Sequence, residues 1–238
     1  METKDNPFLI PLSIVVAGAL IGAGIYFSGI GSAPQPKNTQ ANATASGKPT
    51  REALLQGAVK LGNPDAKVVM VEYADFQCPF CGKFQKETMP LIVENYIKNG
   101  QVLFAYKDYA FLGDESTYAA EAAQCAGEQD KFWQYHDYLY KYLWDNYYSK
   151  NRNGENVGAF SKSELKKFAN TLGLNTTAFN FCLDSGKYEA AVKESTEQGR
   201  GFGVDGTPAF FIEGELVTGA LPYSQFKAAL DEALKNTN

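Results

Sequence analysis

Residues 68–81 have the sequence VVMVEYADFQCPFC, in which an apolar run leads into two cysteines separated by two residues. The β-branched run 68–73 predicts a buried central strand, and the segment 82–98 that follows the cysteines predicts a helix. A helix N-terminus carries unpaired N–H groups and a partial positive charge, which stabilise a thiolate beside it. We therefore expect Cys78 to have a lowered pKa and to act as a nucleophile at an exposed helix end, with Cys81 as the resolving thiol.

The two residues between the cysteines are expected to tune the redox site. Pro79 has no N–H to offer to a thiolate, and proline suits the first position of a helix. Phe80 would place apolar surface beside the sulfur atoms.

The remaining pattern predicts an α/β fold. Strands are expected at a short segment from Val59, at 102–106, at 209–212 and at 216–218. Residues 116–198 have a helical pattern, and a last helix is expected at about 222–234. The order is strand, helix and strand, then several helices, then a hairpin and a helix.

Two residues modify the expected helices. Pro90 is expected to kink the helix 82–98, because proline removes one backbone donor. Ser161 and Glu164 have the spacing of a capping box, which predicts a helix start there, and Gly173 predicts its end.

A second motif lies far downstream, where Gly206-Thr207-Pro208 precedes the apolar run 209–212. Together, DFQCPFC at 75–81 and GTPAFF at 206–211 resemble the active-site turn and the cis-proline loop of DsbA-like thiol-disulfide oxidoreductases of the thioredoxin superfamily. Residues 217–220 and the segment that follows resemble the C-terminal strand and helix of that family. The resemblance runs from about Ala58 to the end of the chain.

The resemblance implies a thioredoxin fold with a helical subdomain inserted at about 115–200. It also implies a cis bond before Pro208 and a substrate chain that pairs with the backbone of Thr207. Strongly oxidising members of the family carry a histidine where this chain has Phe80, so the strength of the oxidant stays open.

Glu72 is a further candidate, because relatives keep a buried acidic residue near this place. Such a carboxyl group could exchange a proton with Cys81. A glutamate at a sheet edge or on the surface explains the residue equally well, and Asp75 competes for the same role.

Cys125 and Cys182 both fall in the expected helical insertion, and several relatives carry cysteines at similar places. In an oxidising compartment such a pair usually forms a disulfide, here a structural one that joins two helices. The alternative is two buried free thiols.

No metal and no cofactor beyond a redox-active Cys78–Cys81 disulfide is predicted. A structural zinc site at the two cysteines would need further ligands, and Cys125, His136 and Cys182 are isolated from one another. His136 lies in an aromatic helical stretch, where we expect it to pack rather than catalyse.

The N-terminus predicts a membrane anchor. Residues 8–30, FLIPLSIVVAGALIGAGIYFSGI, carry no charge and are long enough to cross a bilayer as one helix. Residues 1–7 would form a short cytoplasmic tail, 31–52 a flexible linker, and 53–238 the thioredoxin-like domain. A cleaved signal peptide remains the alternative, with cleavage near residues 31–33.

The sequence thus predicts a single-pass protein of the plasma (inner) membrane, whose extracytoplasmic domain introduces disulfides into exported polypeptides. Family analogy adds a membrane reoxidase of the DsbB or vitamin K epoxide reductase-like type as partner. A net charge of −5 gives no support for nucleic-acid binding. The alternatives are a reductase or isomerase of the same fold, or a tethered protein-binding module without catalysis.

Overall fold

A computed structural model of the chain describes residues 48–237. The predicted membrane anchor 8–30 and tail 1–7 lie outside the described residues, as does most of the predicted linker. Within residues 48–237, no helix is both long enough and apolar enough to cross a membrane.

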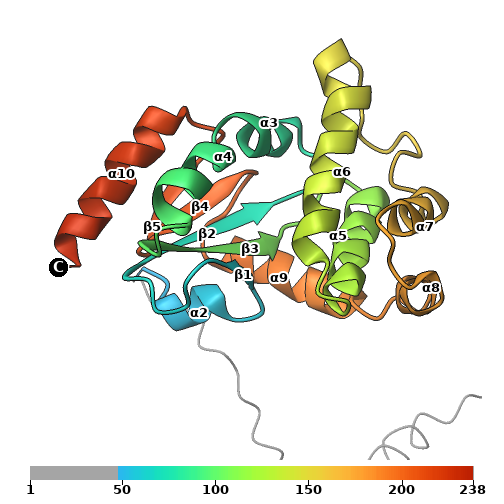
Figure 1. The fold of residues 1–238 in the computed structure, drawn as a ribbon, viewed down its shortest axis with the longest axis horizontal. Coiled ribbons are helices and arrows are strands. Elements are labelled where there is room, and N and C mark those ends of the chain that lie inside the picture. Colours follow the sequence, from blue (N-terminus) through green and yellow to red (C-terminus); the bar gives the residue numbers. More distant parts are fainter. Residues whose placement is uncertain (1–47, 238) are drawn as a thin grey trace, which may run out of the picture. The chain divides into compact units, whose positions relative to one another are not determined.

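The described part of the chain forms a mixed sheet in the order β1-β3-β2-β4-β5 (Figure 1). Its strands are β1 (Val59–Leu61), β2 (Val68–Ala74), β3 (Val102–Asp108), β4 (Ala209–Ile212) and β5 (Glu215–Thr218). Strands β2 and β3 are parallel, and the other neighbouring pairs are antiparallel. All residues of β2, β3 and β4 are buried, in agreement with the apolar runs that predicted them.

Helices cover both faces of the sheet. Their bounds are α2 (Arg51–Leu55), α3 (Pro79–Glu87), α4 (Met89–Ile92), α5 (Asp114–Gly127), α6 (Phe132–Asn146), α7 (Lys162–Thr171), α8 (Thr176–Asp184), α9 (Glu189–Gly201) and α10 (Tyr223–Asn236). The described part of the chain also contains two short helical segments, η1 (Val93–Ile97) and η2 (Tyr148–Lys150). In Figure 1, α3, α4 and α10 lie on one face of the sheet, α2 and α9 on the other, and α5 to α8 at one end.

The alternation of side chains along β2 divides the core between these faces. Met70 and Ala74 belong to the larger cluster, with α3, α6 and α10, whereas Val71 and Tyr73 belong to a smaller one beside α2. Helix α9 packs closely on that second face because Gly199 has no side chain: a Cβ there would lie 2.9 Å from Tyr73 Cδ1.

The helix predicted at 82–98 is wrong in its bounds. Helix α3 already begins at Pro79, which occupies its first turn, and it ends at Glu87. The helix is interrupted at Thr88, and Pro90 lies in the first turn of the next helix, α4. A proline in the interior of one continuous helix would have removed a backbone hydrogen bond, whereas the first turn of a new helix needs no donor from it. The last turn is a π-helix, η1.

The predicted capping box is also wrong in its contacts. Ser161 does precede α7, but its side chain makes no capping bond. Its hydroxyl instead pairs with the hydroxyl of Ser163 at 3.1 Å, and Glu164 forms an ion pair with Lys167 at 2.6 Å. The helix start lies where the sequence predicts it. The predicted stop is confirmed as well, because α7 ends at Thr171 and Gly173 has the left-handed backbone angle, φ +69°, that ends a helix.

Strands, insertion and hairpin follow the predicted order, with α5 to α9 between β3 and β4. This confirms the prediction of a mixed α/β, thioredoxin-like fold with inserted helices.

Candidate active site

The redox turn, residues 75–81, connects the end of β2 with the start of α3. Cys78 is the residue just before the helix, with extended backbone angles, and Pro79 follows it in the first turn. The N–H of Cys78 donates to the carbonyl of Asp75 at 3.0 Å, and the N–H of Gly82 donates to the carbonyl of Cys78 at 3.0 Å. These bonds hold Cys78 at the N-terminus of α3, where the helix favours a negative charge. The structure contains Cys78 and Cys81 as free thiols.

The expectation that Cys78 is exposed is wrong. Its side chain is only 5 % exposed, and Cys81 is fully buried. The loop of Thr207 and Pro208 covers the sulfur, since Cys78 Sγ donates to the carbonyl of Thr207 at 3.3 Å. The Thr207–Pro208 peptide bond is cis. Phe80, by contrast, is 61 % exposed beside the buried pair.

The two thiols differ in acidity. Hydrogen bonding from the Cys81 thiol, together with backbone N–H groups of Cys81 and Phe80, lowers the pKa of Cys78 to about 7, although burial opposes this. Burial raises the pKa of Cys81 well above its usual value, and the nearby charges of Cys78 and Glu72 raise it further. Cys78 is therefore the thiol that ionises near neutral pH, and Cys81 keeps its proton.

Glu72 lies in the central strand β2 and is fully buried, so the edge or surface interpretation is wrong. Its Oε2 accepts a hydrogen bond from Gln85 Nε2 at 2.8 Å, while Oε1 has no partner among the described residues. Burial raises the pKa of Glu72 well above its usual value, and the negative charge of Cys78 adds to the effect. The carboxyl group is thus suited to hold a proton beside the two thiols.

Asp75, the competing candidate, is saturated with hydrogen bonds. Its Oδ1 accepts from the N–H of Gln77 at 2.8 Å and from Ser116 Oγ at 2.7 Å. Its Oδ2 accepts from the N–H groups of Phe111 at 2.9 Å and Leu112 at 3.1 Å. These donors favour the charged carboxylate, although burial still raises the pKa of Asp75. Asp75 therefore organises the redox turn rather than offering a free oxygen to the thiols.

Gln77 connects the redox turn with the helical insertion, a role that no sequence motif indicates. Its side chain is fully buried, donates to Ser116 Oγ at 2.8 Å and accepts from the N–H of Asn156 at 2.7 Å. Its carbonyl accepts from the hydroxyl of Tyr148. Asn156 and Tyr148 lie in the segment that follows α6, far away in the sequence, so no local pattern could have linked them to Gln77.

The second cysteine pair lies within the insertion. Cys125 of α5 and Cys182 of α8 form a disulfide with a Cα–Cα distance of 5.9 Å. Both side chains are buried, and Cys182 Sγ lies 3.8 Å from Glu128 Oε1. The bridge joins two helices of the insertion.

His136 of α6 is buried among aromatic rings, in agreement with the expected packing role. Its ring centroid lies 4.8 Å from that of Tyr106 and 5.0 Å from that of Tyr140. Its Nδ1 pairs with Asp137 Oδ1 at 2.8 Å. In residues 48–237, no three His, Cys, Asp or Glu side chains are grouped as metal ligands would be.

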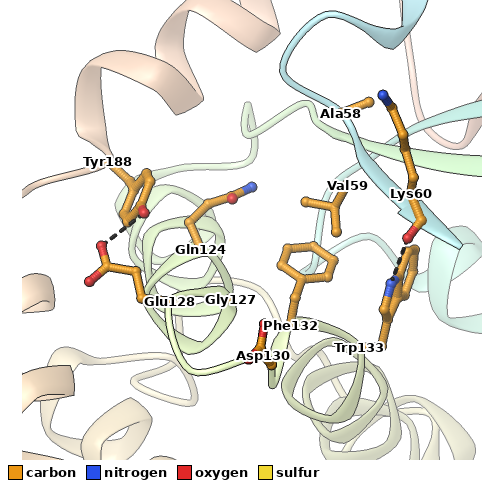
Figure 2. A pocket seen from close by; sticks show the side chains of 10 residues that line it. All are labelled: Ala58, Val59, Lys60, Gln124, Gly127, Glu128, Asp130, Phe132, Trp133 and Tyr188. Carbon is orange, nitrogen blue, oxygen red and sulfur yellow. Dashed lines mark hydrogen bonds between the residues drawn. The ribbon is translucent and has the colours of Figure 1, made fainter.

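Cavities open on the described surface, and two of them lie beside α6. One, of about 570 Å³, lies between β1 and the region where α5 ends and α6 begins (Figure 2). Figure 2 shows Glu128 bonded to Tyr188, and Phe132 and Trp133 beside Val59 and Lys60. No residue of the redox turn lines it. The other, of about 690 Å³, lies between α3 and α6 and includes Gln85 in its wall.

An acidic thiol at a helix N-terminus, a buried partner thiol and a cis-proline loop against the sulfur define a thiol-disulfide oxidoreductase. The Thioredoxin family model matches residues 55–232, so the chain belongs to this family, and within it the chain is DsbA-like.

Relatives support this assignment. Disulfide bond formation protein D of Bacillus subtilis is 27 % identical over 201 residues, which cover 84 % of this chain and 85 % of that protein. The crystal structure of oxidised BdbD from Bacillus subtilis matches with a TM-score of 0.68 and 23 % identity, over 80 % of this chain and 98 % of that one. The structure of alpha-DsbA1 from Wolbachia pipientis matches with a TM-score of 0.65 and 21 % identity, over 76 % and 92 % of the two chains. At these identities the two structures establish the fold.

Proposed function

We propose that this protein is a membrane-anchored oxidoreductase that introduces disulfides into exported polypeptides through Cys78 and Cys81. The observation that carries the proposal is the position of Cys78 at the start of α3, with its sulfur 3.3 Å from the carbonyl of Thr207 in the cis-proline loop; the lowered pKa of Cys78 agrees with this position. Residues 8–30 would hold the domain at the outer side of the plasma (inner) membrane, in an oxidising compartment.

The reaction would proceed by two thiol-disulfide exchanges. A substrate thiolate attacks Cys78 Sγ of the oxidised pair, a mixed disulfide forms, and Cys81 leaves with the electron pair and takes up a proton. A second substrate thiolate then attacks the substrate sulfur of the mixed disulfide, which forms the substrate disulfide and releases Cys78 as a thiolate. The lowered pKa of Cys78 makes it a good leaving group in this second step.

Several residues would assist these exchanges. The backbone of Thr207, next to the sulfur, is placed to pair with an extended substrate chain, and Pro208 adds no competing N–H. Phe80 offers exposed apolar surface beside the site. Glu72 would exchange the proton with Cys81.

We expect electrons to pass from the substrate thiols to the Cys78–Cys81 disulfide. A thiol pKa below the usual range stabilises the reduced form and makes the disulfide more oxidising. The export route implied by the N-terminal segment favours an oxidase as well. By family analogy, a membrane reoxidase of the DsbB or vitamin K epoxide reductase-like type would restore the disulfide.

The test is the reduction potential of the Cys78–Cys81 couple in the full-length protein, equilibrated with glutathione. An oxidase predicts a potential well above the roughly −270 mV of thioredoxin. A value near thioredoxin's would assign the protein as a reductase instead. Oxidation of a reduced peptide with two cysteines by the protein, and its loss in Cys78→Ala, tests catalysis itself. A cellular phenotype that survives Cys78→Ala would indicate a binding module.

A further inference from the structure

Gln85 is the one side chain that hydrogen-bonds the buried carboxyl group of Glu72 among the described residues. It lies one helical turn after Cys81 on α3, so both residues project from the same face of the helix. Its Nε2 donates to Glu72 Oε2 at 2.8 Å, which leaves Oε1 without a partner in the described part of the chain.

Gln85 also reaches the cavity between α3 and α6. Gly82, Tyr140 and Trp144 line this cavity with it, as do the exposed residues Lys86 and Lys141. The amide of Gln85 therefore lies between the buried carboxyl group and a groove that opens to the surface.

The titratable groups around Glu72 come from the redox turn and from α3, β3 and α6. Cys78 and Cys81 face it from the redox turn and α3, Tyr106 from β3 and Tyr140 from α6. On its other side, β4 places the apolar Phe210 opposite Glu72 in the sheet. Burial and the charge of Cys78 raise the pKa of Glu72, and the hydrogen bond from Gln85 lowers it.

We propose that Gln85 is a positioning residue of the redox site, which holds Glu72 through Oε2 so that Oε1 exchanges the proton with Cys81. The inference rests on the role of Glu72 in the proposed function. When a substrate thiolate forms its bond to Cys78, the Cys78–Cys81 bond breaks and the electron pair goes to Cys81. The carboxyl group of Glu72 gives its proton to Cys81, the resulting carboxylate is stabilised by Gln85, and a proton from solvent in the groove restores the acid.

The experiment measures how fast dithiothreitol reduces the oxidised full-length protein in a single turnover, as a function of pH. The observed reduction rate is divided by the concentration of the dithiothreitol thiolate. In the wild type this rate falls as pH rises through the pKa of Glu72, because the proton donor is lost. Gln85→Met removes the bond that favours the carboxylate, so the fall moves to higher pH by about one unit. Gln85→His keeps a donor and retains the wild-type midpoint.

Two matched variants distinguish the loss of the Gln85–Glu72 hydrogen bond from a general disturbance of the redox site. Lys86→Met changes the neighbouring residue of the same groove without touching Glu72, and it leaves the midpoint unchanged. Glu72→Gln removes the pH-dependent fall, and Gln85→Met then has no further effect on the profile. A midpoint that stays fixed in Gln85→Met, or an equal shift in the Glu72→Gln background, overturns the proposal. Dithiothreitol is the reductant here, so these profiles remain decisive even if the protein fails to oxidise peptides and the proposed function falls.

Discussion

The two cysteine pairs of this molecule are almost equally buried, yet their surroundings differ in charge. Cys78 is 5 % exposed and Cys182 is 3 % exposed, so exposure does not separate them. The sulfur of Cys78 lies at the N-terminus of α3, where backbone N–H groups favour a thiolate. The sulfur of Cys182 instead lies 3.8 Å from a carboxylate oxygen of Glu128, which disfavours a thiolate there, although the ion pair of Glu128 with Lys187 weakens this effect. We therefore expect the polar groups around each sulfur, rather than its accessible area, to decide which pair reacts.

The largest effect is expected when the reactive sulfur is removed. Cys78→Ala should reduce peptide oxidation to the uncatalysed rate, because no mixed disulfide can form without that sulfur. Stability should change little, since the substitution leaves α3 and its neighbours in place. The assay is oxidation of a reduced two-cysteine peptide, with thermal unfolding measured in parallel. Residual turnover well above the uncatalysed rate would show that another group carries out the reaction.

Removal of the other cysteine pair should have the opposite effects on stability and turnover. Cys125→Ala with Cys182→Ala opens a bridge between residues 57 positions apart. The loop-entropy model gives a loss of about 4 kcal/mol in the free energy of unfolding, whereas turnover is retained. Thermal or denaturant unfolding checks the first outcome and the peptide assay the second. Loss of turnover in a variant that stays folded would show that this pair takes part in the redox reaction.

The acidity of Cys78 predicts a pH profile for the reduced protein. Alkylation requires the thiolate, so its rate should rise with pH and reach half its maximum near the pKa of about 7. An unperturbed cysteine would reach this point at about pH 8.5. Cys81 should stay unlabelled over the same range, because its pKa is raised by burial. Iodoacetamide kinetics with peptide mapping measure both. A midpoint for Cys78 near 8.5 would remove the main argument for its reactivity.

The smallest effect concerns the carboxylate beside the second pair. Lys187 lowers the pKa of Glu128 through a hydrogen bond, so Glu128 is ionised at neutral pH. Glu128→Gln should make the Cys125–Cys182 bridge more reducible, by roughly two- to fivefold, since the carboxylate is partly exposed and its field is screened. The rate of bridge opening in dithiothreitol provides the measurement, and Glu197→Gln on α9 serves as a control for loss of one surface charge. Equal rates in the Glu128 variant and wild type would show that burial alone protects the bridge.

Much of the fold and the reactive pair could be predicted from short segments. The apolar run of β2 and the following cysteines are local signals, and the strand, the helix N-terminus and the order of acidity follow from them. The break at Thr88 shows the limit of such patterns. Pro90 indicated a disturbance in the helix, but proline is tolerated in a first turn, and only the packed structure decides where that turn begins.

The remainder of the site depends on contacts between distant segments. The sulfur of Cys78 is covered by Thr207, and Gln77 is held by Asn156 of the insertion. Neither contact leaves a periodic or compositional signal, so the sequence alone predicts an exposed Cys78. The burial of Glu72 was similarly undecided, because a lone glutamate in an apolar run is compatible with an edge strand as well as a central one.

A separation of roles between the two pairs is expected, with thiol-disulfide exchange at Cys78 and Cys81 and a structural bridge at Cys125 and Cys182. It is tested most directly by brief reduction of the oxidised full-length protein with a low concentration of dithiothreitol, followed by alkylation and peptide mass mapping. Cys78 should be labelled first, while Cys125 and Cys182 remain paired. Labelling of all four cysteines at similar rates would contradict it.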